Sequence, residues 1–211
     1  VVNVGKVIGM LVMALVVGLP AATLAQNDYY FPEVDQAELD EDIPSPKQFL
    51  GYDIGTHYTR HDRIVAYFRE LAEKSDKATF QVIGETYEKR PQVVLTLTSS
   101  ENHANIEEIR QQHLTLLDPN EPVLDSSEGK SIVALNYSVH GDETSSGEAA
   151  MLTAYYLIAN ESEEIQQFLE ESVIHIDPAQ NPDGRDRAAH WHNSYKSFPP
   201  VADPADAEHN Q

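Results

Sequence analysis

The sequence contains no cysteine, and basic residues are scarce in it. Without cysteine there is no disulfide framework, no thiolate metal site, no cysteine nucleophile and no lipoprotein anchor. Lys and Arg number 14 against 35 Asp and Glu, which gives a formal net charge of -21. Because such an acidic surface repels nucleic acid and anionic membranes, we expect no nucleic-acid partner.

The composition otherwise fits a folded domain. The 211 residues are enough for one domain of ordinary size, and 41% of them are hydrophobic, which excludes wholesale disorder. We find no internal repeat and no low-complexity segment.

Residues 1–25 have the pattern of a signal peptide. Lys6 precedes an apolar run over residues 7–19, Pro20 ends the run, and Thr23-Leu24-Ala25 offers a small-residue cleavage site. The run is short for a membrane span, although an uncleaved N-terminal anchor is the alternative. We therefore expect an exported protein, periplasmic or extracellular, with no stable membrane span after cleavage. An acidic, extended lead-in is expected over residues 26–46 and the domain over residues 47–211.

Strand and helix patterns alternate along this domain. β-rich runs cover residues 79–86, 92–98, 132–137 and 173–176, and helical spacing of apolar residues follows Thr59 and covers residues 105–117, 145–159 and 162–170. Residues 118–130 and 188–211 are predicted to be loops. The pattern predicts an α/β fold with a mixed, largely parallel sheet flanked by helices, whose sites form beyond the carboxyl ends of the strands.

His140 and Glu143 are the candidate metal ligands. They lie three residues apart on a polar turn that follows the apolar run 132–137 and precedes a helical pattern, and Gly141 permits a tight turn. Imidazole and carboxylate are suitable zinc ligands, so the turn predicts part of a zinc site. His-x-x-Glu also occurs on surface turns that bind no metal.

Other polar residues are assigned structural roles at this point. Glu148 has capping-box spacing from Ser145, which favours a helix cap over a catalytic acid. His57 and His61 are expected at a helix start. His190 and His192 form a loop pair that is expected to bind metal weakly if at all.

Three motifs together resemble the zinc carboxypeptidase family, the carboxypeptidase A-like metallopeptidases. They are the hairpin motif at residues 84–91, His140-Gly141-Asp142-Glu143, and Asn181-Pro182-Asp183-Gly184. The resemblance covers residues 47–196 and implies a carboxypeptidase-like α/β/α sandwich. Lys89 departs from the family pattern, which often has Gly there, and Asp142 stands where well-known members have a substrate-holding Arg.

The resemblance implies an exported metallocarboxypeptidase that hydrolyses peptide bonds near the C-terminus. It makes His140 and Glu143 the first two ligands of one Zn²⁺, while the third His ligand, the substrate-binding pair and the general-base Glu are expected beyond Gln211. The chain is therefore predicted to be the N-terminal part of a larger catalytic domain, and inactive alone.

Two alternatives stay open at this stage. One is a zinc amidohydrolase of the aspartoacylase or succinylglutamate desuccinylase type, which shares the His-x-x-Glu ligands but cleaves small acylated amino acids. The other is a non-catalytic exported binding module on the same scaffold.

Overall fold

The computed structural model describes residues 30–31, 38–116, 119–120 and 129–195. The predicted signal peptide and the final residues therefore lie outside the described part of the chain, as does most of the predicted loop 118–130. The described elements are α2 (Pro46–Leu50), α3 (His61–Lys74), β1 (Ala78–Glu85), β2 (Pro91–Leu97), α4 (Ser100–Ala104), α5 (Ile106–Thr115), β3 (Ser131–Asn136), α6 (Ser145–Ala159), α7 (Glu163–Glu171), β4 (Ser172–Asp177) and α8 (Pro182–Tyr195).

The four predicted strands form one sheet in the order β1-β2-β4-β3. The predicted hairpin is confirmed, since β1 and β2 pair antiparallel. β2 and β4 also pair antiparallel, and among the described strands only β3 and β4 run parallel. The sheet is mixed, as predicted, but the parallel part is smaller than expected because the hairpin joins it with the opposite strand direction.

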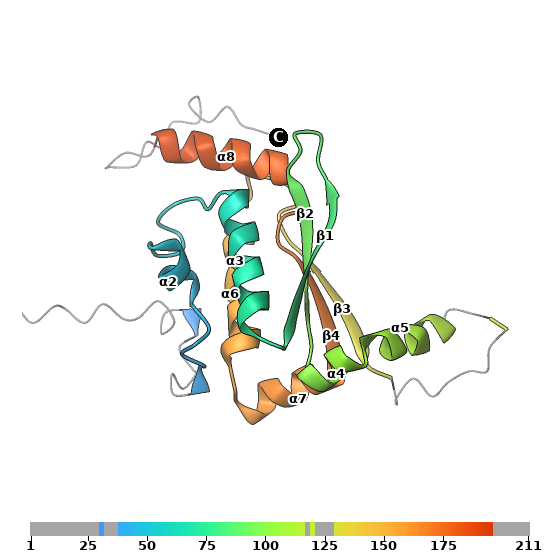
Figure 1. Cartoon of the computed structure of the whole chain (residues 1–211). Helices are drawn as coiled ribbons and strands as arrows, with labels where there is room; N and C mark the ends of the chain where they lie inside the picture. The colour runs from blue at the N-terminus through green and yellow to red at the C-terminus, as the bar shows by residue number, and fades with distance from the viewer. Residues whose placement is uncertain (1–29, 32–37, 117–118, 121–128, 196–211) are drawn as a thin grey trace, which may run out of the picture.

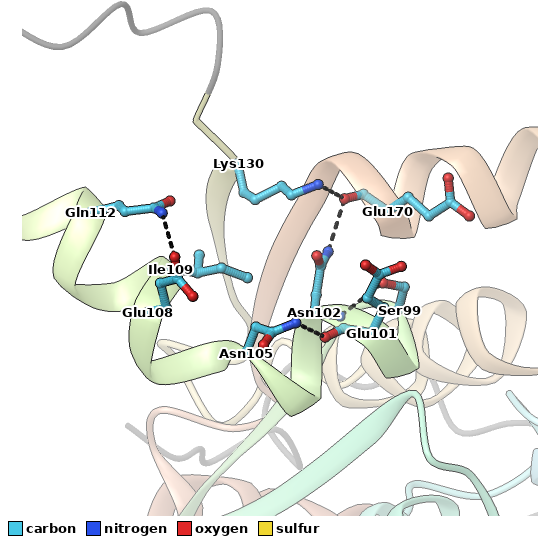
Figure 2. Close-up of a pocket in the computed structure, with 9 residues that line it drawn as sticks. All are labelled: Ser99, Glu101, Asn102, Asn105, Glu108, Ile109, Gln112, Lys130 and Glu170. Carbon is cyan, nitrogen blue, oxygen red and sulfur yellow. Dashed lines mark hydrogen bonds between the residues drawn. The ribbon is translucent and has the colours of Figure 1, made fainter.

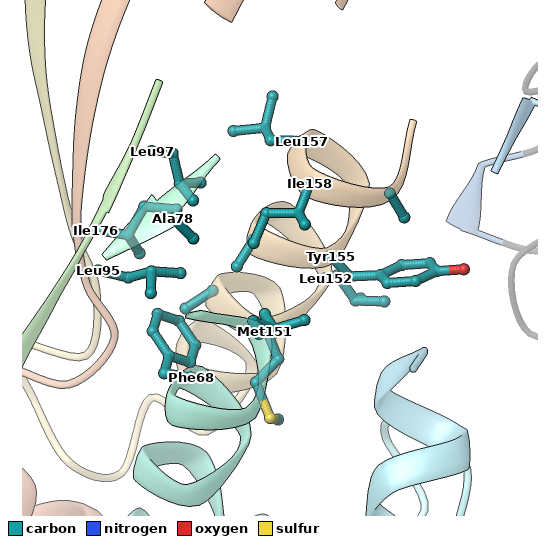
Figure 3. Packing of buried hydrophobic residues seen from close by; sticks show 14 of the residues in the cluster. Phe68, Ala78, Leu95, Leu97, Met151, Leu152, Tyr155, Leu157, Ile158 and Ile176 are labelled. Atoms are coloured by element: carbon teal, nitrogen blue, oxygen red, sulfur yellow. The ribbon is translucent and has the colours of Figure 1, made fainter. Parts of the chain in front are cut away.

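Helices α3 and α6 lie along one face of the sheet and bury the core against it (Figure 1). The helical spacing predicted for α3 is confirmed, because Ile64, Tyr67, Phe68 and Leu71 are fully buried. They meet Met151 and Ile158 of α6 and strand residues such as Leu95 and Ile176 (Figure 3). Since large apolar side chains dominate this layer, hydrophobic burial holds the two helices on the sheet.

The segment before α2 adds to this core. Leu39 and Ile43, in the predicted lead-in, are 8% and 3% exposed, and Leu39 bridges to Asn160 after α6. Ser45 begins α2 with a capping box, in which its hydroxyl accepts from the Gln48 amide and the Gln48 side chain accepts from the Ser45 amide. Residues that precede Lys47 therefore already belong to the hydrophobic core and cap α2.

Two predictions about burial are wrong. A short apolar run such as residues 132–137 is typical of a strand buried on both faces, yet Ile132 of β3 is 37% exposed, since in the described part of the chain β3 lies at the sheet edge. The helical spacing over residues 162–170 predicts Ile165 and Phe168 on the inner face. Phe168 of α7 is 43% exposed, however, and Ile165 and Leu169 fill that face.

One prediction of a loop is wrong as well. Residues 188–195 were expected in a loop but belong to α8, which Asn181 caps by accepting the Gly184 amide. The helix expected over residues 105–117 is confirmed as α5, and a short helix that was not predicted, α4, precedes it and meets it at Asn105.

None of the helices in the described residues is long and apolar enough to cross a membrane.

Candidate metal centre

The candidate ligand turn, His140–Glu143, follows β3 at the point where β3 and β4 end side by side. Backbone hydrogen bonds continue the strand pairing past this point: the Gln180 amide donates to Tyr137 and the Asn181 amide to Ser138, at 2.9 and 3.1 Å. The two polar turns that the sequence placed at the carboxyl ends of strands thus lie against each other. α8 begins at this end of the sheet and runs away from the sheet over the end of α3 (Figure 1).

Gly141 of the ligand turn lies directly against the backbone of α8. A Cβ added to Gly141 would overlap the backbone of Gly184 and Arg185, so no other residue fits without movement. Just before the turn, Ser138 has a φ of 53° and is buried, and its hydroxyl donates to the His140 carbonyl at 3.3 Å. A left-handed non-glycine residue is strained, and here the hydrogen bonds on both sides hold it.

His140 and Glu143 point toward each other. His140 Nδ1 lies 3.3 Å from Glu143 Oε1, and the two side chains are 68% and 57% exposed. Donor atoms about 2.1 Å from a tetrahedral zinc ion lie about 3.4 Å apart, so this donor pair fits two corners of a zinc site. The exposure leaves both donors accessible to an ion and a substrate. The described residues contain no group of three or more side chains that could hold a metal.

The hairpin tip joins the same region. Thr86 donates to Asp183 at 2.7 Å, and Arg90 donates to Asp183 and Asp186, both at 2.7 Å. Burial would raise the pKa of Asp183, but the hydrogen bonds from Thr86 and Arg90 outweigh it and hold the pKa below its ordinary value. The three motifs of the sequence therefore converge on the start of α8.

Lys89 completes this hairpin with a φ of 66°. Only glycine adopts such a left-handed backbone without cost. The departure at Lys89 therefore keeps the turn geometry that favours Gly at this position.

Arg185 and Glu148 are the residues that the sequence analysis missed. Arg185 is fully buried and Glu148 is 5% exposed, and Arg185 Nη2 donates to both carboxylate oxygens of Glu148 at 2.7 and 2.6 Å. Glu148 is therefore not a helix cap as predicted, and α6 has no side-chain cap. The signal was present, since a lone carboxylate in the apolar helix 147–159 needs a buried partner.

Thr59 and Asp62 have the spacing of a capping box, which predicts that Thr59 caps α3, but α3 begins differently. The first helical residue is His61, and the Thr59 amide donates to Glu148 at 2.8 Å. The His61 amide donates to Asp186 at 2.7 Å, so a carboxylate of α8 replaces the expected cap. His61 is 1% exposed, its Nε2 lies 2.7 Å from the Pro91 carbonyl, and burial lowers its pKa.

The other candidate histidines do not form metal sites in the structure. His57 Nδ1 faces the Thr56 hydroxyl at 3.3 Å, while His61 is buried against Pro91. His190 and His192 lie on α8 rather than in a loop, and residues two apart on a helix point in different directions.

The described residues also have a polar hollow at the opposite end of the sheet (Figure 2). It lies beside α7, which leads into the amino end of β4, and its lining includes Ser99, Asn102, Glu108, Lys130 and Glu170. His140 and Glu143 do not line it. The hollow and the ligand turn are therefore separate features.

Fold and site together define an α/β protein with two metal-donor side chains at the carboxyl end of a mixed sheet. The zinc carboxypeptidase family model matches residues 64–200, more than half of the chain. The chain therefore belongs to the zinc carboxypeptidase family, as the three motifs predicted.

Comparisons with solved structures find partial overlaps. Carboxypeptidase A from Helicoverpa armigera is 19% identical at a TM-score of 0.45, with 61% of this chain and 25% of that chain covered. A metallo-carboxypeptidase from Burkholderia cenocepacia is 20% identical at a TM-score of 0.43, with 61% and 28% covered. Bovine thrombin-activatable fibrinolysis inhibitor, in complex with tick carboxypeptidase inhibitor, is 19% identical at 0.40, with 62% and 33% covered.

This chain thus spans about a quarter to a third of the length of these three chains. No curated protein sequence matches it significantly.

Proposed function

We propose that the protein is an exported zinc-dependent metallocarboxypeptidase that hydrolyses peptide bonds near a free C-terminus. The observation that carries the proposal is the pair His140 Nδ1 and Glu143 Oε1, 3.3 Å apart on a turn held by β3, β4 and α8. Membership of the zinc carboxypeptidase family supports the same reading.

In this proposal His140 binds one Zn²⁺ through Nδ1 and Glu143 binds it through its carboxylate. Bound zinc lowers the pKa of water and polarises a carbonyl. The third protein ligand and the general-base glutamate are assigned to parts of the protein outside the described residues. The task of this part of the chain is to hold two ligands rigidly at an open edge of the sheet.

Rigidity follows from the contacts already described. Just before the turn, Tyr137 and Ser138 accept backbone hydrogen bonds from Gln180 and Asn181. Within the turn, Gly141 packs against Gly184. Since a ligand misplaced by a small distance weakens metal binding, a turn fixed by backbone contacts suits this task better than a free loop.

The test measures zinc content and peptidase activity of the full-length protein, its His140→Ala and Glu143→Ala variants, and a control. His113→Ala is the matched control, because His113 lies on α5, away from the ligand turn. We expect the unmodified protein and the control to bind zinc and to release the C-terminal residue of a blocked dipeptide. Both ligand variants should lose zinc and activity.

Substrate choice separates the alternatives. A blocked dipeptide with a free carboxylate should be cleaved, and its C-terminal amide should not. Turnover of an N-acyl amino acid in place of the dipeptide would support the amidohydrolase, and zinc-loaded protein without turnover of either would support a binding module. Full zinc content and activity in His140→Ala would overturn the ligand assignment.

Export is proposed on the signal-peptide pattern of residues 1–25. N-terminal sequencing of the secreted or periplasmic protein should begin at Gln26, and an intact first segment on the cell-associated protein would instead indicate an anchor.

A further inference from the structure

The feature with the most unusual chemistry outside the two ligands is the buried ion pair of Arg185 and Glu148. Arginine is almost never fully buried unless it is paired. Arg185 reaches from α8 to α6, where both of its contacts to Glu148 are shorter than 2.8 Å. The pair thus joins two helices that are far apart in the sequence.

The remaining donors of Arg185 go to backbone carbonyls. Nη1 donates to Thr144 at 2.5 Å and Nε donates to Thr59 at 2.9 Å. Thr144 directly follows Glu143, so the guanidinium holds the carbonyl at the end of the ligand turn. One charged group therefore ties the turn to α8, to α6 and to the segment before α3.

Glycine makes room for this arrangement on both sides of Glu143. A Cβ at Gly147 would lie 3.2 Å from Arg185 Cζ and 2.9 Å from Ile64 Cδ1. At the other end, Gly141 packs on the backbone of Gly184 and Arg185. Gly141 and Gly147, on the two sides of Glu143, therefore both pack against Arg185.

Stability alone does not explain such a pair. A buried ion pair can often be replaced by apolar residues of similar volume without loss of stability, because desolvating both charges offsets their attraction. An apolar pair would not bind the Thr144 carbonyl. The polar version adds directional hydrogen bonds at the ligand turn, which apolar packing lacks.

We propose that Arg185, with Glu148, is a positioning residue for the metal site: it fixes the Thr144 carbonyl and thereby the directions of His140 and Glu143. This inference rests on the proposed function, because it requires the two ligands to bind zinc. Partners behind the ligands of a metal site typically change its affinity about 10- to 100-fold when they are removed.

The experiment compares zinc affinity with stability in the full-length protein. The key variant is Glu148→Leu/Arg185→Met, which removes both charges and leaves no unpaired one. Arg185→Lys keeps the charge but loses the fork that reaches four acceptor atoms on Glu148, Thr144 and Thr59, so it tests the same geometry if the double variant fails to fold. The control is Asn102→Ala, a buried polar truncation beside α7 at the opposite end of the sheet (Figure 2).

Zinc affinity is measured by competition with a chromogenic chelator, stability by urea unfolding, and site geometry by the visible spectrum of the Co²⁺-substituted protein. We expect at least about a tenfold loss of zinc affinity and an altered Co²⁺ spectrum in both Arg185 variants. Asn102→Ala should keep the affinity and spectrum of the unmodified protein even though it is less stable.

The outcomes separate the two proposals. Unchanged zinc affinity and Co²⁺ spectrum in the Arg185 variants, with zinc lost in His140→Ala, would overturn the positioning role and leave the zinc site standing. Zinc binding that survives His140→Ala would overturn the ligand assignment itself. If Asn102→Ala lost as much zinc affinity, the loss in the Arg185 variants would be explained by general destabilisation, and the positioning role would also be overturned.

Discussion

Replacing Gly141 by alanine is the sharpest single perturbation of the ligand turn. The added methyl would meet the backbone of Gly184 and Arg185 rather than a movable side chain. Either the turn or the first turn of α8 must therefore shift. Tyr137 and Ser138 precede the turn, and Gln180 and Asn181 precede α8. The two hydrogen bonds between these residues, Gln180 to Tyr137 and Asn181 to Ser138, are the contacts that such a shift breaks.

The size of the effect follows from these contacts. Overpacking costs about 1–3 kcal/mol, and each lost hydrogen bond costs about 1 kcal/mol. Alanine restricts the unfolded chain, which returns about 0.4–1 kcal/mol. The net destabilisation should be about 2–5 kcal/mol, a large fraction of the roughly 5–15 kcal/mol that stabilises a typical protein.

Urea unfolding of the full-length protein measures this free energy, with Gly84→Ala as the matched control. A Cβ at Gly84 would come 3.3 Å from Gln92 Oε1, the end of a side chain that can rotate, so the control should change stability by less than about 1 kcal/mol. If Gly141→Ala is as mild as Gly84→Ala, the ligand turn is not packed against α8 and the account of the site is refuted.

Three further predictions concern stability. Asn102→Ala should cost about 1–2 kcal/mol in urea unfolding, because the side chain loses its bonds while the carbonyls of Leu169 and Glu170 keep other donors. Burial lowers the pKa of His61 from 6.5, so below about pH 6.5 the unfolded chain binds a proton that the folded protein does not. The free energy of unfolding should therefore fall as pH drops below about 6.5, and His61→Gln should flatten this decline in the unfolding midpoints. Adding zinc at about 100 times its Kd to the metal-free full-length protein should stabilise it by about 2.7 kcal/mol, measured as a rise in Tm that His140→Ala lacks.

The sheet and its covering helices could be predicted because their signals are local. Alternation and turn residues located the hairpin of β1 and β2, and helical spacing located α3 and α6. The capping box at Ser45 and Gln48 was equally local and had been overlooked. What spacing could not give was the exposure of β3, because burial depends on which elements lie beside a strand.

Helix α8 shows how a polar site hides a helix from a sequence pattern. Its buried side is formed by Arg185, Ala188 and Ala189, so the position that would carry a large apolar residue carries a charge. The pattern therefore indicated a loop. The turn Asn181-Pro182 nevertheless had the features of a helix start, a capping side chain followed by proline.

The ligand turn depends on residues that the chain order keeps apart. His140 and Glu143 are close in sequence, and the resemblance to zinc carboxypeptidases selected them. Glu148 and Arg185 are 37 residues apart, and only the parallel pairing of β3 and β4 brings their segments together. Spacing assigned Glu148 to a cap because a carboxylate near a helix start serves that role when it is exposed. With Arg185 behind the turn, the same carboxylate becomes the buried partner of the residue that holds the candidate ligand turn.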